Sequence, residues 1–244
     1  MRFSQAWIIA RHDLGLIRGR KGVLVPLIAM PLGVAIGFPF LIGYIADSAG
    51  GVAPYVSGFI DAFSFWFVIT AAALPTTIAA YGVVGEKVEK SLEPLLSTPT
   101  TDSEILLGKI LAAFVPTMLA VWASSVLYMG LVDWEVFGFL GHLYFPNSEI
   151  VVILLLLAPL ACFYGIEVSI LVSSRVTDVR TAQQYAGLVF LPLIFLYVAG
   201  EIGTPKLDTT NLLYISAAFV VLVLALFFAS TRTFHRDEIL TRWK

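Results

Sequence analysis

The feature that most restricts how this chain can fold is a succession of long apolar runs, separated by short stretches that carry most of the charge. Of the 244 residues, 59% are hydrophobic and 13% are charged, whereas a soluble domain carries about a quarter charged residues. A helix of about 20 apolar residues crosses the hydrocarbon core of a bilayer. The chain is therefore predicted to be an all-α integral membrane protein.

Six apolar runs predict six transmembrane helices in a single domain that covers residues 1–244. The spans are expected at about 23–46, 60–84, 105–132, 150–174, 185–200 and 211–231. The first run corresponds to about 36 Å of helix, enough to cross with some tilt. The fifth run is the shortest and contains Pro192. Residues 47–58 and 133–149 are expected to be loops, the second with a belt of interfacial aromatic side chains.

Residues 1–22 predict an amphipathic helix that lies in the headgroup region of the membrane. Its apolar stripe has spacings of four and three and consists of Phe3, Trp7, Ala10, Leu14 and Ile17. Five cations lie mostly around the rest of this helix: Arg2, Arg11, Arg18, Arg20 and Lys21. They are expected to face anionic membrane lipid. A signal peptide is the alternative, but the basic region and the apolar run after it are too long for one.

The basic residues indicate which way the spans run. With both termini in the cytoplasm, including a charged tail at 232–244, fourteen of the 15 Lys and Arg residues fall on the cytoplasmic side and only Lys206 falls outside. This distribution agrees with the positive-inside rule. It predicts a multi-pass protein of the plasma membrane, and it supports six spans because losing one would place several basic clusters outside.

A polar segment at 85–109 interrupts the apolar runs between the second and third spans. An apolar stripe of one short helix is formed by Val88, Leu92, Leu95 and Leu96, and its other side by Glu86, Glu89, Lys90 and Glu93. Pro94 kinks or restarts this helix. From the pattern alone, a solvated loop with a surface helix is an equally good interpretation. Thr101 and Glu104 have the spacing of a capping box, which predicts that the next helix begins near Glu104.

This polar segment resembles the signature of ABC transporter permeases of the type-2 family. The matching residues are Gly85-Glu86, the stretch Ser91 to Pro99 (SLEPLLSTP) and the stretch Glu104 to Lys109 (EILLGK). Lys90 and Ser91 depart from the family pattern, which usually has Gly and Thr there. Six spans with both ends inside are similar to the type-2 plan over the whole chain. The resemblance implies that residues 85–104 form a coupling helix, which docks on a separate ATP-binding subunit.

By the same resemblance, the chain is the membrane-spanning subunit of an ABC exporter that works by alternating access. The implied assembly has a second permease copy, forming a homodimer, and two ATP-binding subunits that hold ATP and Mg²⁺. The residues expected to contact the ATP-binding subunit are Glu86, Glu89, Lys90, Leu92, Glu93, Leu95 and Leu96. The leucines are expected to supply the grip, although an alternative places them against lipid with only the acids on the partner.

The sequence contains no motif for covalent chemistry or for binding a nucleotide. It lacks the G-x-x-x-x-G-K-[ST] phosphate loop, a Ser/His/Asp arrangement and an H-E-x-x-H pair. The three histidines are scattered, and the single cysteine, Cys162, lies in an apolar run. We therefore expect no catalytic residue, metal site or cofactor on this chain, and no nucleic-acid partner.

Glu167 is the one acid well inside an expected span, where an unpaired charge costs at least about 2.5 kcal/mol near the bilayer centre. A structural hydrogen bond to a neighbouring helix and a role in the transport pathway both remain open for it. Further polar residues that a pathway could use are Thr70, Tyr81, Tyr164 and Tyr185. By the resemblance, the second and fifth spans line the pathway.

Two other classes of function stay open at this stage. An ion-coupled secondary carrier needs ionisable groups inside the membrane, and Glu167 is thin support for one. A membrane assembly factor or anchor that transports nothing is the other. Co-purification of an ATP-binding protein separates the exporter from both alternatives. The transported substrate is not specified by any of these residues.

Overall fold

The computed structural model describes residues 3–48, 53–80, 101–176, 181, 184–185, 187–201 and 207–233. Every regular element within these ranges is helical, which confirms the all-α fold class. The elements are α1 (Phe3–Arg18), α2 (Lys21–Ser48), α3 (Ala53–Ser64), α4 (Trp66–Ala80), α7 (Asp102–Leu140), α8 (Ser148–Val152), the π-helical turn η2 (Ile153–Leu157), α9 (Ala158–Arg175), the 3₁₀ turn η3 (Gly187–Val189), α11 (Phe190–Glu201) and α12 (Thr209–Thr233).

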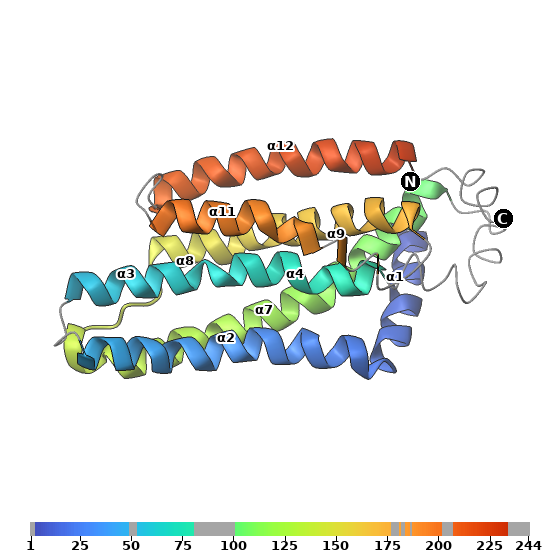
Figure 1. The fold of residues 1–244 in the computed structure, drawn as a ribbon. Coiled ribbons are helices and arrows are strands. Elements are labelled where there is room, and N and C mark those ends of the chain that lie inside the picture. The colour runs from blue at the N-terminus through green and yellow to red at the C-terminus, as the bar shows by residue number, and fades with distance from the viewer. Residues whose placement is uncertain are drawn as a thin grey trace.

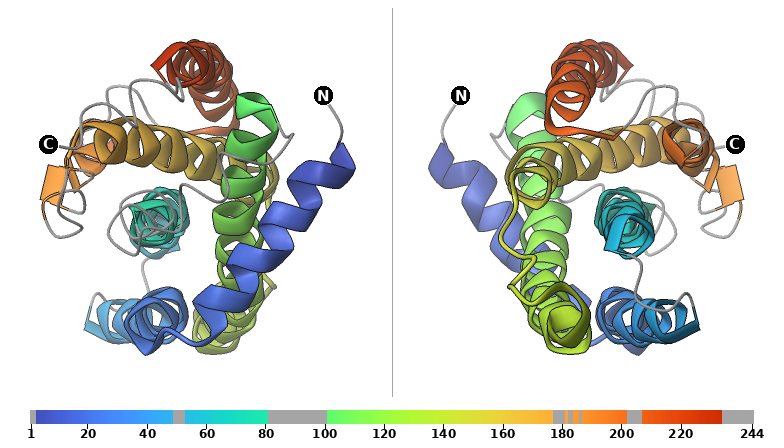
Figure 2. Two further views of the ribbon diagram at one scale, coloured as in Figure 1. Left: turned by 90° about the vertical axis from the view of Figure 1, so that its right-hand side faces the viewer. Right: turned by 90° about the vertical axis from the view of Figure 1, so that its left-hand side faces the viewer.

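The long helices lie side by side in one bundle, and α1 runs across one end of it (Figure 1). Viewed along the bundle, α4 lies inside a ring formed by α2, α7, α9 and α11 (Figure 2). Within the described ranges, five helices are long and apolar enough to cross a membrane: Lys21–Ser48, Val56–Ala79, Ser103–Leu140, Ser148–Ser173 and Thr209–Ser230. The fifth apolar run of the sequence gives the shorter helix Gly187–Gly200.

Two loop predictions were wrong at their boundaries. Residues 47–58 were expected to be a loop, but α3 already begins at Ala53, because Pro54 is well tolerated in the first turn of a helix. The third span was expected to end at Val132, but α7 continues to Leu140. Acidic residues do not stop a helix, whereas Gly141 does, in the left-handed conformation at φ 71°.

The fourth expected span is one helix with a π-helical turn inside it. In this turn the N–H of Ala158 bonds to the carbonyl of Ile153, five residues earlier. Pro159 has no N–H to continue the pattern, and the indole Nε1 of Trp122 instead donates to the carbonyl of Leu154 at 2.9 Å. The π-turn is therefore stabilised by a hydrogen bond from a side chain of α7.

Helices α4 and α9 pack closely and run in the same direction. A Cβ added at Gly165 of α9 would lie 2.2 Å from the backbone oxygen of Ala72 in α4. One turn further along both helices, the Ser169 hydroxyl donates to the carbonyl of Thr76 at 3.0 Å. The close approach needs a glycine, and it fixes the register of the two helices at the centre of the bundle.

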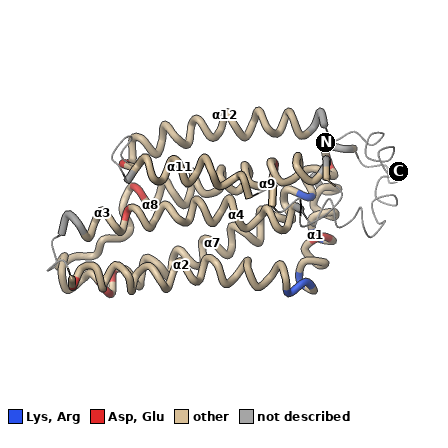
Figure 3. Tube along the Cα trace, viewed as in Figure 1, with Lys and Arg blue, Asp and Glu red and all other residues tan. Residues whose placement is uncertain are grey.

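Charged residues separate toward the two ends of the bundle (Figure 3). Lys and Arg gather at the end that carries α1, while most of the Asp and Glu residues of the described helices lie at the opposite end. The apolar middle between them has the composition that a bilayer core requires.

Candidate functional site

The residues predicted to contact an ATP-binding subunit lie outside the described ranges. These residues are Glu86, Glu89, Lys90, Leu92, Glu93, Leu95 and Leu96. Tyr81, which was predicted for the transport pathway, also lies outside these ranges. Their role stays a prediction. The structure does describe the two helices that flank residues 81–100, which are α4, ending at Ala80, and α7, beginning at Asp102.

The first turn of α7 has the predicted capping box. The backbone N–H of Glu104 donates to the Thr101 hydroxyl at 3.4 Å, and the backbone N–H of Thr101 donates to the Glu104 carboxylate at 3.0 Å. Each side chain satisfies a backbone donor that the first turn of a helix leaves open. The helix therefore has a fixed start within the polar segment, two residues before the expected Glu104.

Two turns into α7, helix α1 lies directly on its surface. A Cβ at Gly108 would lie 2.8 Å from the Cβ of Ile9 and 2.9 Å from the backbone oxygen of Ala6. Neither atom is the far end of a flexible side chain, so no larger residue fits at 108 without moving α1. Gly108 belongs to the EILLGK stretch, and no pattern in the sequence indicated that it contacts the N-terminal helix.

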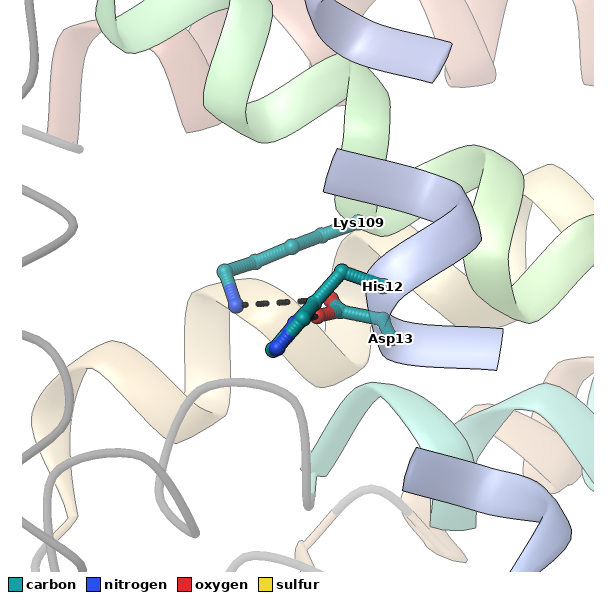
Figure 4. Close-up of polar contacts among 3 residues, drawn as sticks. All are labelled: His12, Asp13 and Lys109. Carbon is teal, nitrogen blue, oxygen red and sulfur yellow. Dashed lines mark hydrogen bonds and ion pairs between the residues drawn. The ribbon is translucent and has the colours of Figure 1, made fainter. Parts of the chain in front are cut away.

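The next residue, Lys109, forms a buried ion pair with α1 (Figure 4). Its Nζ lies 3.8 Å from Oδ2 of Asp13, and the two side chains are only 4% and 11% exposed. The exposed His12 ring lies beside the pair, with Nδ1 3.4 Å from Oδ1 of Asp13. The sequence analysis did not predict a role for Asp13. It is the only acid in α1, and its position among cations is the sequence signal that could have pointed to it.

The predicted apolar stripe of α1 agrees only in part with the face that the helix buries. The helix buries Ala6, Ile9, Ala10 and Asp13 against the bundle; Ala10 belongs to the expected stripe, whereas Trp7 of that stripe is 45% exposed. Hydrophobic spacing assigned the stripe to lipid, but α1 uses small residues and an ion pair to pack on α7. Exposed Trp7 and exposed cations such as Arg11 and Arg18 remain on the outward side of the same helix.

Glu167, the acid inside the fourth expected span, lies deep in the bundle. It is 1% exposed, and its Oε2 has no hydrogen-bond partner among the described residues. One turn toward the start of α9, Phe163 stacks on Phe114 of α7 with ring centroids 4.5 Å apart. Thr70 of α4 and Thr117 of α7 are also fully buried with hydroxyls that have no partner in the described ranges. Buried polar groups without partners are costly and are therefore candidates for a functional role.

Two of the predicted pathway tyrosines, Tyr164 and Tyr185, line one apolar groove. The groove has a volume of about 440 Å³ and lies beside the second half of α9, at the approach to α11. Its other lining residues are Val168, Val172, Val176, Leu188 and Val189. Thr70 and Glu167 are not part of this groove, so the structure divides the predicted polar residues between a groove and the buried core.

At the opposite end of the bundle, a polar network that the sequence did not predict holds the segment after α7. Asp133 accepts from the backbone N–H of Tyr144 at 2.8 Å and from that of Phe145 at 3.1 Å. The Tyr144 hydroxyl donates to Asp61 of α3 at 2.7 Å. Burial and this bond to Asp61 raise the pKa of Tyr144 well above its ordinary value, so the hydroxyl stays a donor. The network joins α3 and α7.

No group of three or more His, Cys, Asp or Glu side chains with metal-binding geometry occurs in the part of the chain that the structure describes. Cys162 is fully buried. These observations add no catalytic centre to the helical bundle.

Comparison with known families decides which membrane protein this bundle is. Residues 46–230, about three quarters of the chain, match the model of the ABC-2 family transporter proteins. The chain belongs to the ABC-2 transporter family. No curated protein matches the chain significantly. As an ABC-2 family protein, the chain is the membrane subunit of an ABC transporter and is not itself catalytic, and the family implies partnership with an ATP-binding subunit.

Proposed function

We propose that this ABC-2 protein is the permease of an exporter and that residues 85–104 are its coupling helix. The observation that carries the proposal is the position of the flanking helices. Residues 81–100 connect the end of α4 to the capped start of α7, at the end of the bundle where Lys and Arg gather (Figures 1 and 3). By the positive-inside rule this end faces the cytoplasm, where an ATP-binding subunit is located.

The proposed topology has six spans with both termini in the cytoplasm of a plasma-membrane protein. Helix Gly187–Gly200 is the fifth span, too short to cross as a straight apolar helix without flanking residues or local thinning of the bilayer. An even number of crossings keeps α1 and the charged tail on the same side, together with the coupling helix.

The leucines of the coupling helix provide most of the proposed binding free energy. Fully burying one leucine is worth about 1.5 to 3 kcal/mol, whereas an exposed ion pair is worth about 0.2 to 1 kcal/mol. Leu92, Leu95 and Leu96 therefore hold the partner, and Glu86, Glu89, Lys90 and Glu93 select it and set its register.

The working assembly we propose has two permease copies and two ATP-binding subunits, which hold ATP and Mg²⁺. Closure of the two ATPases moves the coupling helices and switches the bundle between inward and outward access. Tyr164 and Tyr185, which share a groove, and the buried Thr70 and Glu167 are the polar residues of this chain assigned to the pathway or to its support.

The test uses the permease reconstituted in nanodiscs with its cognate ATP-binding subunit. Leu95→Asp is expected to abolish stimulation of ATP hydrolysis while the protein still inserts in the membrane. The matched control is Leu143→Asp, because Leu143 is 64% exposed and lies just beyond the end of α7 away from α1. Unchanged ATPase stimulation in Leu95→Asp would rule out binding of the ATP-binding subunit through these leucines.

One observation favours a second candidate function. The buried carboxyl of Glu167, whose Oε2 has no partner among the described residues, is the kind of group an ion-coupled carrier uses. A carrier transports in proteoliposomes that contain this chain alone, in response to an ion gradient. The exporter requires the ATP-binding subunit and ATP under the same conditions.

A further inference from the structure

The contact between α1 and α7 is built as a fixed joint. Gly108 removes the side chain where the two helices cross, and the backbone of α1 occupies the space, with the Ala6 oxygen 2.9 Å from where a Cβ would be. Ala6 and Ala10, the small residues on the α1 side, are fully buried. Such close backbone approach makes interfaces that are shape-specific and resist sliding.

The buried ion pair beside this crossing fixes the rotation of α1. Asp13 contacts the Lys109 ammonium only if the acid faces α7, and a buried carboxylate that loses its cation costs several kcal/mol. Turning Asp13 inward also leaves the outward side of α1 without an acid. Figure 4 shows Lys109 reaching from α7 toward Asp13.

Helix α1 is connected directly to α2. A turn of only two residues separates them, and its backbone bonds run from Gly19 N to Leu16 O at 3.2 Å, from Arg20 N to Ile17 O at 3.0 Å and from Leu24 N to Arg20 O at 3.1 Å. Helix α2 itself packs against α7. Helix α1 therefore links the start of α2 to the start of α7, which it crosses at Gly108 (Figure 2).

We propose that α1 is part of the device that transmits motion from the ATP-binding subunit to the membrane helices, with Asp13, Gly108 and Lys109 as its positioning residues. This inference rests on the proposed function. The start of α7 lies two turns before the joint, so a displacement of the polar segment that moves α7 moves α1 and, through the short turn, the start of α2. The coupling helix then drives the first and third spans as one body.

The first experiment introduces a larger side chain at Gly108, which should displace α1 from α7. Gly108→Leu is compared with Gly130→Leu, because a Cβ at Gly130 of the same helix meets open space. Maleimide labelling of a cysteine introduced at Ala10 reports whether α1 still packs on α7, because position 10 is fully buried in the native protein. Assembly is read from co-purification with the cognate ATP-binding subunit, and coupling from stimulated ATP hydrolysis.

In assembled Gly108→Leu, we expect labelling at position 10 to rise and ATPase stimulation to fall by at least about fivefold, the lower end of the usual range for coupling between sites. Gly130→Leu should keep native labelling and stimulation. A Gly108→Leu complex that labels at position 10 yet keeps full stimulation would overturn the proposal.

A second pair of variants serves if Gly108→Leu fails to insert. Lys109→Met alone leaves Asp13 buried without this cation, and we expect α1 to lift and stimulation to drop. Asp13→Leu combined with Lys109→Met replaces the pair by apolar groups, which is often neutral for stability. The double variant should keep α1 seated and restore stimulation. Loss of stimulation with α1 seated would contradict a mechanical role for the joint.

Failure of this inference and failure of the proposed function give different results. If the protein is not an ATP-driven permease, the wild-type chain itself neither binds nor stimulates the ATP-binding subunit. If only the inference fails, the wild type stimulates hydrolysis and so do the variants whose α1 has lifted.

Discussion

At the residue scale, the glycines of the described helices fall into two groups with opposite expected responses to substitution. At helix crossings, as at Gly165 and Gly108, backbone atoms of a neighbouring helix lie within 3 Å of the position that the Cβ of a larger residue would occupy. Others, such as Gly130 and Gly138, have no atom within 4 Å. The sequence shows both groups as glycines in apolar runs, so only the structure separates packing glycines from exposed ones.

Gly165→Ala should destabilise the bundle, because its Cβ would lie 2.2 Å from the Ala72 oxygen and the backbone of α4 cannot rotate away. Overpacking of this kind costs about 1 to 3 kcal/mol. The measurement is the thermal unfolding midpoint in detergent, with Gly138→Ala as the control. Gly138→Ala should be neutral or slightly stabilising, since alanine is the better helix former. Equal midpoints for the two variants would contradict the close crossing of α4 and α9.

Glu167→Gln should leave the unfolding midpoint unchanged or raise it. The amide carries no charge to desolvate, and the native carboxyl has an oxygen without a partner in the described ranges. Glu149→Gln is the comparison, because Glu149 accepts from the Thr209 hydroxyl at 2.7 Å. A clear fall in the midpoint of Glu167→Gln alone would show that the carboxylate is stabilised by a partner. ATPase stimulation in the same variant reports whether its ionisation matters for transport.

At the scale of helices, the sequence predicted which elements exist better than where they end. Hydrophobic length found the helices of all six runs, and residue chemistry found the capping box at Thr101. Boundaries were predicted less well: α7 continues past Asp133 to Leu140 because an acidic residue does not stop a helix, and the helix ends only at Gly141 in the left-handed conformation. The face that α1 buries was predicted only in part, since periodicity does not distinguish a face that packs on protein from one that contacts lipid.

The π-turn gives a prediction at this scale. Trp122→Phe keeps the ring size close to native but removes the donor to the Leu154 carbonyl, leaving that carbonyl without its bond across the helices. A buried backbone acceptor left unsatisfied costs about 1 to 3 kcal/mol. Thermal unfolding of Trp122→Phe, compared with Trp134→Phe at an 82% exposed position, measures the loss. Equal midpoints would show that the π-turn does not depend on α7.

At the scale of the whole molecule, the separation of charge could be predicted from the sequence almost completely, and the candidate site only in part. The sequence predicted a coupling segment from its polarity and its motif, and that prediction lies outside the described residues. It could not show that the motif's Gly108 and Lys109 are used to seat the N-terminal helix, because their contacts, Ile9 and Asp13, lie about a hundred residues earlier. Long-range pairings of this kind leave no local pattern.

The proposed orientation is tested with single cysteines at the two ends of the bundle. Ser48→Cys at the end of α2 should react with a membrane-impermeant maleimide on intact cells, because the acidic end faces outward. Arg18→Cys at the end of α1 should react only after permeabilisation. Both positions are exposed, and the native Cys162 is fully buried. The reverse labelling pattern would contradict the assigned topology.

The most direct measurement of the central claim is site-specific photocrosslinking from position 95 in native membranes. A photoreactive residue in place of Leu95 should crosslink to a separate protein that contains a phosphate-binding loop, and the yield should depend on ATP. Crosslinking to lipid alone, or labelling of position 95 from outside the cell, would contradict the account of this chain as a permease driven by an ATP-binding partner.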